Sequence, residues 1–238
     1  MTNFPYSGGF TSKLYSHFFS QKARIPGFIG GLLLAWAATT AAHSASFGES
    51  FTNPTPFVLF EYGLTEVDSG DLSVRGGAKS DKKDSGWRLG GGVKFDNGVF
   101  AEGFYADLGK LSFTGGAGGT FRSRAGTLPF TAGTVDIEAK TLGLGIGYEL
   151  ALTEGLYLNL VAGGHRWDIS ASTTVSGVTV TGSDGTDIYG GIGLRKTLTD
   201  NISIIGGARS YEIDTNTNTS GGGDVTMMSL GLQFSLSP

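Results

Sequence analysis

The sequence contains no cysteine, which excludes a disulfide framework, a thiolate metal site and a cysteine nucleophile. Charged residues make up only 16% of its 238 residues, with 17 basic against 21 acidic, so no basic surface points to nucleic acid. After residue 46 no run of about 18 apolar residues occurs, so the pattern predicts no transmembrane helix there. Glycine is abundant instead, with 41 residues, but without the Gly-X-Y period of collagen.

The N-terminal segment has the layout of a secretory signal peptide. Its only charges, Lys13, Lys22 and Arg24, precede an apolar run over residues 27–42, and small residues follow. A membrane anchor is the alternative, although the run is shorter than the ~20 apolar residues that a span needs. The sequence predicts a signal peptide and cleavage region at residues 1–46 and one acidic exported domain at residues 47–238.

Apolar residues alternate with other residues at a period of two through the rest of the chain, which is typical of β-strands with two different faces. In residues 142–150, for example, Leu, Ile and Tyr alternate with Gly and Glu. A tight hairpin turn at Asp96-Asn97-Gly98 joins two such segments. The pattern predicts eight strands, at residues 57–65, 86–95, 98–108, 135–150, 155–169, 187–198, 202–213 and 225–236.

The connections between these strands alternate in length. Three are short turns, at residues 96–98, 151–154 and 199–201. Four are long and polar, at residues 66–85, 109–134, 170–186 and 214–224. Short turns at one end, long loops at the other and an even number of ~10-residue strands are features of bacterial transmembrane barrels. The sequence therefore predicts an all-β fold, an eight-stranded antiparallel up-and-down transmembrane β-barrel.

A soluble lipocalin-like barrel shows the same alternation with its apolar face inside, so the face opposite the aliphatic one decides between the two. That face carries glycines and charged residues, which do not make an apolar core. Unpaired buried charges are costly, so these residues must pair. We predict that Glu61, Arg88, Glu102 and Arg209, at comparable heights above the turns, form a network that fills the lumen. The charged residues of this face are Glu61, Arg88, Lys94, Glu102, Glu149, Arg195 and Arg209.

Aromatic residues near the predicted strand ends indicate the girdles that mark the two membrane interfaces. Surface aromatics without a membrane role are the alternative for any one of them. The residues are Tyr62, Trp87, Tyr105, Trp167 and Tyr189.

Residues 100–110, FAEGFYADLGK, preceded by the hairpin GGGVKFDNG at residues 90–98, resemble the small outer-membrane barrels of the OmpA/OmpX type. The resemblance covers the predicted mature chain. It implies insertion by the barrel-assembly machinery into the outer membrane of a Gram-negative-type bacterium. It also implies roles from structural support through adhesion and serum resistance to lipid modification.

Catalysis has one candidate, His165 in the segment GGHRWD. A lipid A-modifying enzyme needs a serine within bonding distance of a histidine, and Ser170 and Ser172 are nearby in sequence. Alternation instead places His165 on the lumen side, which favours a structural hydrogen-bonding role. Neither metal-ligand spacing nor a phosphate-binding loop is present, so we expect no metal and no cofactor. The run Gly115–Gly119 is predicted to be a flexible loop.

The sequence predicts a non-enzymatic outer-membrane protein with a structural or surface-interaction role through its four long loops. A narrow channel or transporter for small or hydrophobic solutes is the alternative, and a lipid A-modifying enzyme is a third. The expected partners are outer-membrane lipids and lipopolysaccharide, the barrel-assembly machinery, and host or envelope ligands of the loops. We expect a monomer.

Overall fold

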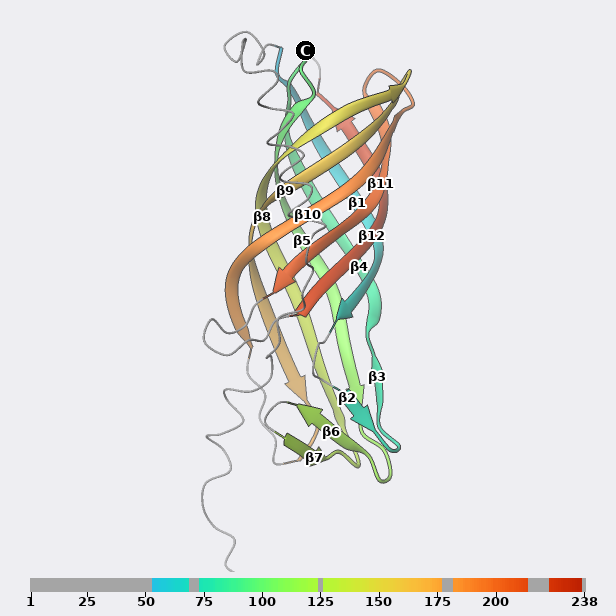
Figure 1. Ribbon diagram of the computed structural model, residues 1–238, viewed down its shortest axis with the longest axis vertical. Coiled ribbons are helices and arrows are strands. Elements are labelled where there is room, and N and C mark those ends of the chain that lie inside the picture. The colour runs from blue at the N-terminus through green and yellow to red at the C-terminus, as the bar shows by residue number, and fades with distance from the viewer. Residues whose placement is uncertain (1–52, 69–72, 124–125, 177–181, 214–222, 237–238) are drawn as a thin grey trace, which may run out of the picture.

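A computed structural model describes residues 53–68, 73–123, 126–176, 182–213 and 223–236. The predicted signal peptide lies outside the described residues. Eight long antiparallel strands form a closed barrel, as predicted, with short turns at one end and the longer connections at the other (Figure 1). We call these the turn end and the loop end. The barrel strands are β1 (Thr55–Asp68), β4 (Lys83–Lys94), β5 (Val99–Thr114), β8 (Thr134–Thr153), β9 (Leu156–Thr173), β10 (Ser183–Thr197), β11 (Ile202–Ile213) and β12 (Gly223–Ser235).

The barrel closes because β1 pairs with both β4 and β12. The strand register, followed strand by strand around the barrel from Thr55, returns to β1 at Thr65, ten residues further along. Such a stagger makes the strands tilt against the barrel axis, and tilt, stagger and strand number together set the diameter. With eight strands the interior is just wide enough to be filled by side chains.

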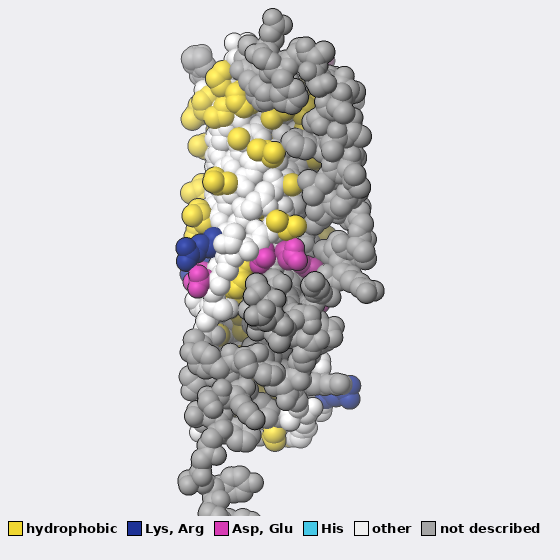
Figure 2. Space-filling view, turned by 60° about the vertical axis from the view of Figure 1, so that its left-hand side comes forward, with side chains coloured by type: hydrophobic (Ala, Val, Ile, Leu, Met, Phe, Trp, Pro, Cys, Tyr) yellow, Lys and Arg dark blue, Asp and Glu magenta, His cyan; other side chains and the backbone are white. Residues whose placement is uncertain are grey.

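Apolar side chains cover the outside of the barrel. Leu64 is 71% exposed and Leu144 75%, whereas Glu61 and Arg88 are fully buried. Figure 2 shows these hydrophobic side chains over the upper part of one face, with charged side chains beginning below them. This is the arrangement of a membrane barrel and the reverse of a lipocalin, so the interpretation of the two faces is confirmed.

The predicted aromatic girdle is wrong for two of its five residues. Trp167 and Tyr189 are each 1% exposed and point into the lumen. Both lie at odd-numbered positions of β9 and β10, on the same face as the inward residues His165 and Arg195. Position near a strand end was therefore the wrong criterion for these two residues, because the alternation of faces decides which way a ring points.

The strands also extend beyond their predicted ends, and four short strands lie where loops were predicted. These are β2 (Ser73–Arg75), β3 (Lys79–Asp81), β6 (Thr120–Ser123) and β7 (Gly126–Pro129). β2, β6 and β7 form a small sheet at the loop end, and β3 pairs with the end of β5 (Figure 1). We call β2, β6, β7 and the turn at residues 115–119 the cap.

The cap packs on the loop end of the barrel's apolar core through aromatic rings. The rings of Phe113 and Phe121 are 5.3 Å apart, and those of Phe121 and Phe130 6.1 Å apart, in edge-to-face contacts. The glycine run predicted as a flexible loop is a hydrogen-bonded turn, in which the Gly115 amide donates to the Gly133 carbonyl at 2.8 Å. The described part of the chain contains no helix that could cross a membrane.

Candidate functional site in the barrel lumen

Four charged side chains from β1, β4, β5 and β11 meet in the middle of the lumen. The guanidinium of Arg88 donates to Glu61 Oε2 at 2.8 Å and to Glu102 Oε1. Arg209 donates to the other oxygen of Glu61 at 2.6 Å. The structure thus brings together all four residues of the predicted network in one chain of ion pairs. Two carboxylates and two guanidinium groups balance, as burial of charge requires.

Neutral groups add hydrogen bonds to the carboxylates of this central network. The Tyr189 hydroxyl donates to Glu102 Oε1 at 3.0 Å, and the Ser229 hydroxyl donates to Glu61 Oε1 at 2.9 Å. The Arg88 guanidinium also lies 4.4 Å from the centre of the Phe104 ring. Each carboxylate therefore accepts hydrogen bonds from both charged and neutral donors, which fixes its position in the lumen.

A second network, which the sequence analysis did not assemble, lies nearer the turn end. Arg195 forms a two-pronged ion pair with Glu149, Nε to Oε1 at 2.7 Å and Nη2 to Oε2 at 2.8 Å. Lys94 Nζ lies 3.2 Å from the same carboxylate. All three residues were placed on the lumen face, but their mutual contact crosses the barrel between strands that are not neighbours. Alternation cannot reveal such a contact.

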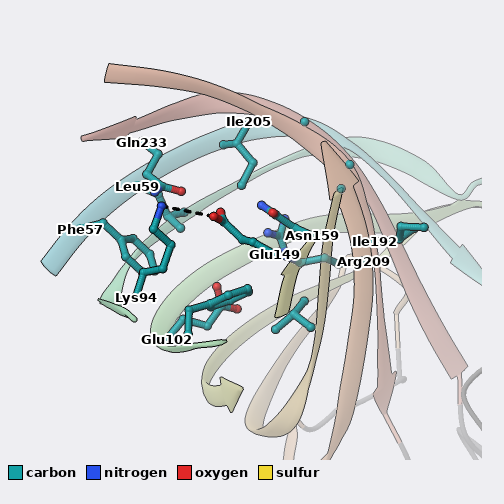
Figure 3. A pocket seen from close by; sticks show the side chains of 15 residues that line it. Phe57, Leu59, Lys94, Glu102, Glu149, Asn159, Ile192, Ile205, Arg209 and Gln233 are labelled. Carbon is teal, nitrogen blue, oxygen red and sulfur yellow. Dashed lines mark ion pairs between the residues drawn. The ribbon is translucent and has the colours of Figure 1, made fainter. Parts of the chain in front are cut away.

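A small cavity of about 20 Å³ separates the two networks. Figure 3 shows Glu102 and Arg209 of the central network and Lys94 and Glu149 of the second network around it, with the ion pair between Lys94 and Glu149 dashed. A volume of this size has room for about one water molecule. The described side chains therefore leave little free space between the two networks.

Aromatic rings fill the lumen on the loop side of the central network. The rings of Tyr189 and Tyr211 stack with centroids 5.9 Å apart, and His165 packs edge-on to Tyr211 at 5.6 Å. Both ring nitrogens of His165 form hydrogen bonds, Nδ1 with the Thr141 hydroxyl at 2.7 Å and Nε2 with the Glu212 carbonyl at 2.9 Å. His165 thus has the structural hydrogen-bonding environment that alternation favoured.

The two candidate serines do not meet this histidine. Ser170 and Ser172 are exposed on β9, whereas His165 lies on the inward face of the same strand. A nucleophile must lie within hydrogen-bond reach of its base, and residues on opposite faces of one strand do not. Among the residues that the structure describes, no three His, Asp or Glu side chains are placed to hold a metal ion.

Beyond the aromatic layer, the lumen becomes an apolar core that continues toward the cap. It surrounds a cavity of about 30 Å³, whose lining includes Asp68 beside apolar residues and glycines. Its walls come from six strands. The inward apolar residues here are Val67, Leu108, Leu111, Ile137, Ala139, Ile169, Ile213 and Val225.

The outer membrane protein beta-barrel domain family matches residues 31–236. The chain belongs to this family. An outer-membrane barrel of this family lies in the outer membrane, which agrees with the lipid-facing exterior described above. No curated protein matches the chain.

Several solved structures of outer-membrane proteins are similar to this family member. The attachment invasion locus protein Ail of Yersinia pestis, in complex with the heparin analogue sucrose octasulfate, is 14% identical over 76% of this chain and 99% of its own, with a TM-score of 0.45. OprG of Pseudomonas aeruginosa is 12% identical over 80% and 100%, with a TM-score of 0.46. A major outer membrane protein of Thermus thermophilus is 10% identical over 77% and 99%, with a TM-score of 0.49.

Proposed function

We propose that this outer-membrane barrel conducts no solutes and acts at the cell surface, in a structural or surface-interaction role. The observation that carries the proposal is the filled lumen. Two ion-pair networks, an aromatic layer and an apolar core follow one another along the barrel axis. A solute would have to break several buried ion pairs to pass, and each broken pair leaves an uncompensated buried charge.

The loop end supports a role outside the cell. In outer-membrane barrels the short turns face the periplasm and the longer connections face outward. A membrane crossing needs ~10 residues per strand, whereas β8 has 20 and β9 has 18, so both project well beyond the bilayer. Because the projecting part has an apolar core and ends in the folded cap, it presents a defined surface.

Conductance in planar lipid bilayers tests the proposal against a narrow channel. The expected result is no single-channel current from the folded full chain in salt solution. Arg88→Met, which removes the cation shared by Glu61 and Glu102, is measured beside it. A current through this variant alone would show that the central network closes the lumen. Stepwise currents from the unaltered protein would contradict the proposal and favour the channel.

No catalytic role is part of the proposal, because His165 is buried among Thr141, Tyr189 and Tyr211. Mass spectra of lipid A from cells with and without the protein should be identical. A mass change that depends on His165 would show that the protein modifies lipid after all.

The proposal also includes the route to the membrane. We infer that residues 1–46 are removed on export and that residues 47–238 are inserted as a monomer by the barrel-assembly machinery, among lipids and lipopolysaccharide. The mass of the protein purified from outer membranes should place its first residue between Ala42 and Phe47. An intact N-terminus there would contradict the assignment of a signal peptide.

A further inference from the structure

The charged side chains that face the lumen on the turn side of the aromatic layer do not balance. Four cations stand against three carboxylates, so one positive charge is left over. The further inward carboxylate of Asp187 lies on the loop side of Tyr189, where it accepts a hydrogen bond from the Trp167 indole. An uncompensated charge inside a barrel is costly, so the excess has to be stabilised by some other group. The cations are Arg88, Lys94, Arg195 and Arg209, and the carboxylates are Glu61, Glu102 and Glu149.

The excess charge belongs to the network near the turn end. Arg195 donates to both oxygens of Glu149, and its Nη1 donates to the hydroxyls of Thr197 and Ser203. Lys94 shares the same carboxylate, with its Nζ 3.2 Å from Oε2. The central network pairs two carboxylates with two guanidinium groups and has no negative charge to spare. Lys94 is thus a cation without a carboxylate of its own.

Two residues that line the cavity between the networks each carry a buried polar atom without a partner. Arg209 Nε and Asn159 Oδ1 form no hydrogen bond with another described residue. Each of these two residues is 8% exposed. In the view of Figure 3, Asn159 and Arg209 lie on one side of Glu149 and Lys94 lies on the other. Because buried polar groups are almost always hydrogen-bonded, the two atoms indicate a small ligand in this cavity.

The carboxylates in the cavity wall do not supply the missing negative charge. Glu102 is bound by Arg88, and Glu149 is bound by Arg195. A water molecule would satisfy the unpartnered polar atoms but would leave the excess charge unchanged. A small anion provides both a hydrogen-bond acceptor and the missing charge.

We propose that this cavity binds one monovalent inorganic anion, for which chloride is the probe. The anion accepts a hydrogen bond from Arg209 Nε, and the amide of Asn159 turns so that its Nδ2 donates to the anion as well. The anion enters from the turn end, because the side chain of Lys94, the last residue of β4, is 24% exposed. A cavity of about 20 Å³ favours an ion little larger than a water molecule and excludes large organic anions.

A hydrated lysine is the alternative explanation. Water that reaches Lys94 from the turn end would stabilise its charge, and the cavity would hold only water. The identity of the salt would then affect the unaltered protein and variants of Lys94 equally. The anion site concerns the interior near the turn end, so its failure would leave the role proposed for the loop end as it is.

The test is the melting temperature of the folded full chain in detergent micelles, measured by circular dichroism in sodium chloride and in sodium gluconate. Equal ionic strength keeps screening the same, so a difference reports binding of the small anion. We expect the unaltered protein to melt at a higher temperature in chloride, with a shift that grows with chloride concentration. Lys94→Met should lose this shift, and Lys196→Met at an exposed position of β10 should keep it.

Asn159→Asp is a second, independent variant. A new buried carboxylate is ordinarily destabilising, but here it would take the place of the anion. This variant should be at least as stable in gluconate as the unaltered protein, and its melting temperature should not respond to chloride. Asn201→Asp in the exposed turn is the matched control and should keep the response. The absence of a chloride shift in the unaltered protein, an equal shift in Lys94→Met, or strong destabilisation by Asn159→Asp in gluconate would overturn the proposal.

Discussion

Arg88 holds the central network together, because it is the one residue that contacts both carboxylates. Replacing it by methionine keeps much of the volume but leaves Glu61 and Glu102 without their shared cation. We expect Arg88→Met to lower the free energy of unfolding by about 3 to 5 kcal/mol in urea titrations of the lipid-embedded protein. Lys196→Met, an exposed cation near the turn end, is the control and should change little. An unaltered midpoint for Arg88→Met would mean that the network contributes nothing to stability.

Asp224 lies outside the membrane and makes the stability of the folded barrel depend on pH. On β12 it lies on the loop side of Met228, the lipid-facing residue nearest the loop end. Burial, together with the nearby charges of Glu212 and Asp68, raises the pKa of Asp224 to about 6. Because the folded state holds the proton more tightly than the unfolded state, the folded barrel loses stability as pH rises from about 4 through about 6.

Asp224→Asn removes this ionisation. The variant should therefore melt at a higher temperature than the unaltered protein at pH 7, and the gap should close toward pH 4. Melting temperatures between pH 3.5 and 8 measure the difference, and Asp200→Asn in an exposed turn is the matched control. A gap that stays constant over this range would exclude Asp224 as its source.

Gly145 shows how closely the lumen is packed. A Cβ atom at this position would lie 2.0 Å from the Tyr189 hydroxyl, which donates to Glu102. Gly145→Ala should displace Tyr189 and destabilise the barrel by roughly 1 to 3 kcal/mol in urea. Gly164→Ala is the matched control, because its Cβ would meet nothing closer than 3.8 Å. Equal effects of the two substitutions would contradict the packing described for the lumen.

At this scale the sequence predicted which charges face inward, and it predicted the four members of the central network from their distances to the turns. It did not reveal the contact of Glu149 with Arg195, which lie on β8 and β10 with β9 between them. It also misassigned Trp167, whose indole NH donates to Asp187 at 2.7 Å. Contacts across a lumen depend on strand tilt, which the order of residues does not state.

Among the elements, the cap is the one held to the barrel core mainly by aromatic contacts. Phe121→Ala removes the ring between Phe113 and Phe130, and deletion of a buried phenylalanine costs about 3 to 5 kcal/mol. We expect the cap to open while the barrel stays folded, so proteases should cut residues 115–133 much faster without a change in heat stability. Mass spectrometry of the fragments measures the cuts, and Ser80→Ala on exposed β3 is the control. A protected cap in Phe121→Ala would show that these contacts are dispensable.

The sequence analysis did not predict the cap or the extended strand ends, and there is a physical reason for each. β2, β6 and β7 have three or four residues each, too few for a period of two to stand out. In β5 the register shifts between Asp107 and Lys110, where Gly109 has a φ of 79°. This irregularity interrupts the alternation, so the strand seemed to end at residue 108 although it continues to Thr114.

For the whole molecule, the alternation of aliphatic residues with glycine and charge predicted the architecture correctly. The reason is that lipid selects an apolar exterior on every strand, which repeats one simple rule eight times around the barrel. The role proposed for the loop end is not written in that repeat, because it would depend on side chains that the cap brings together.

The central claim is that this chain forms a closed barrel with lipid outside and a filled interior. Expression with its N-terminal segment in a Gram-negative host, followed by gel electrophoresis of the outer-membrane fraction with and without boiling, tests it most directly. We predict a band in that fraction whose mobility changes on boiling, because a folded barrel resists detergent. A soluble periplasmic protein with the same mobility in both samples would contradict the account.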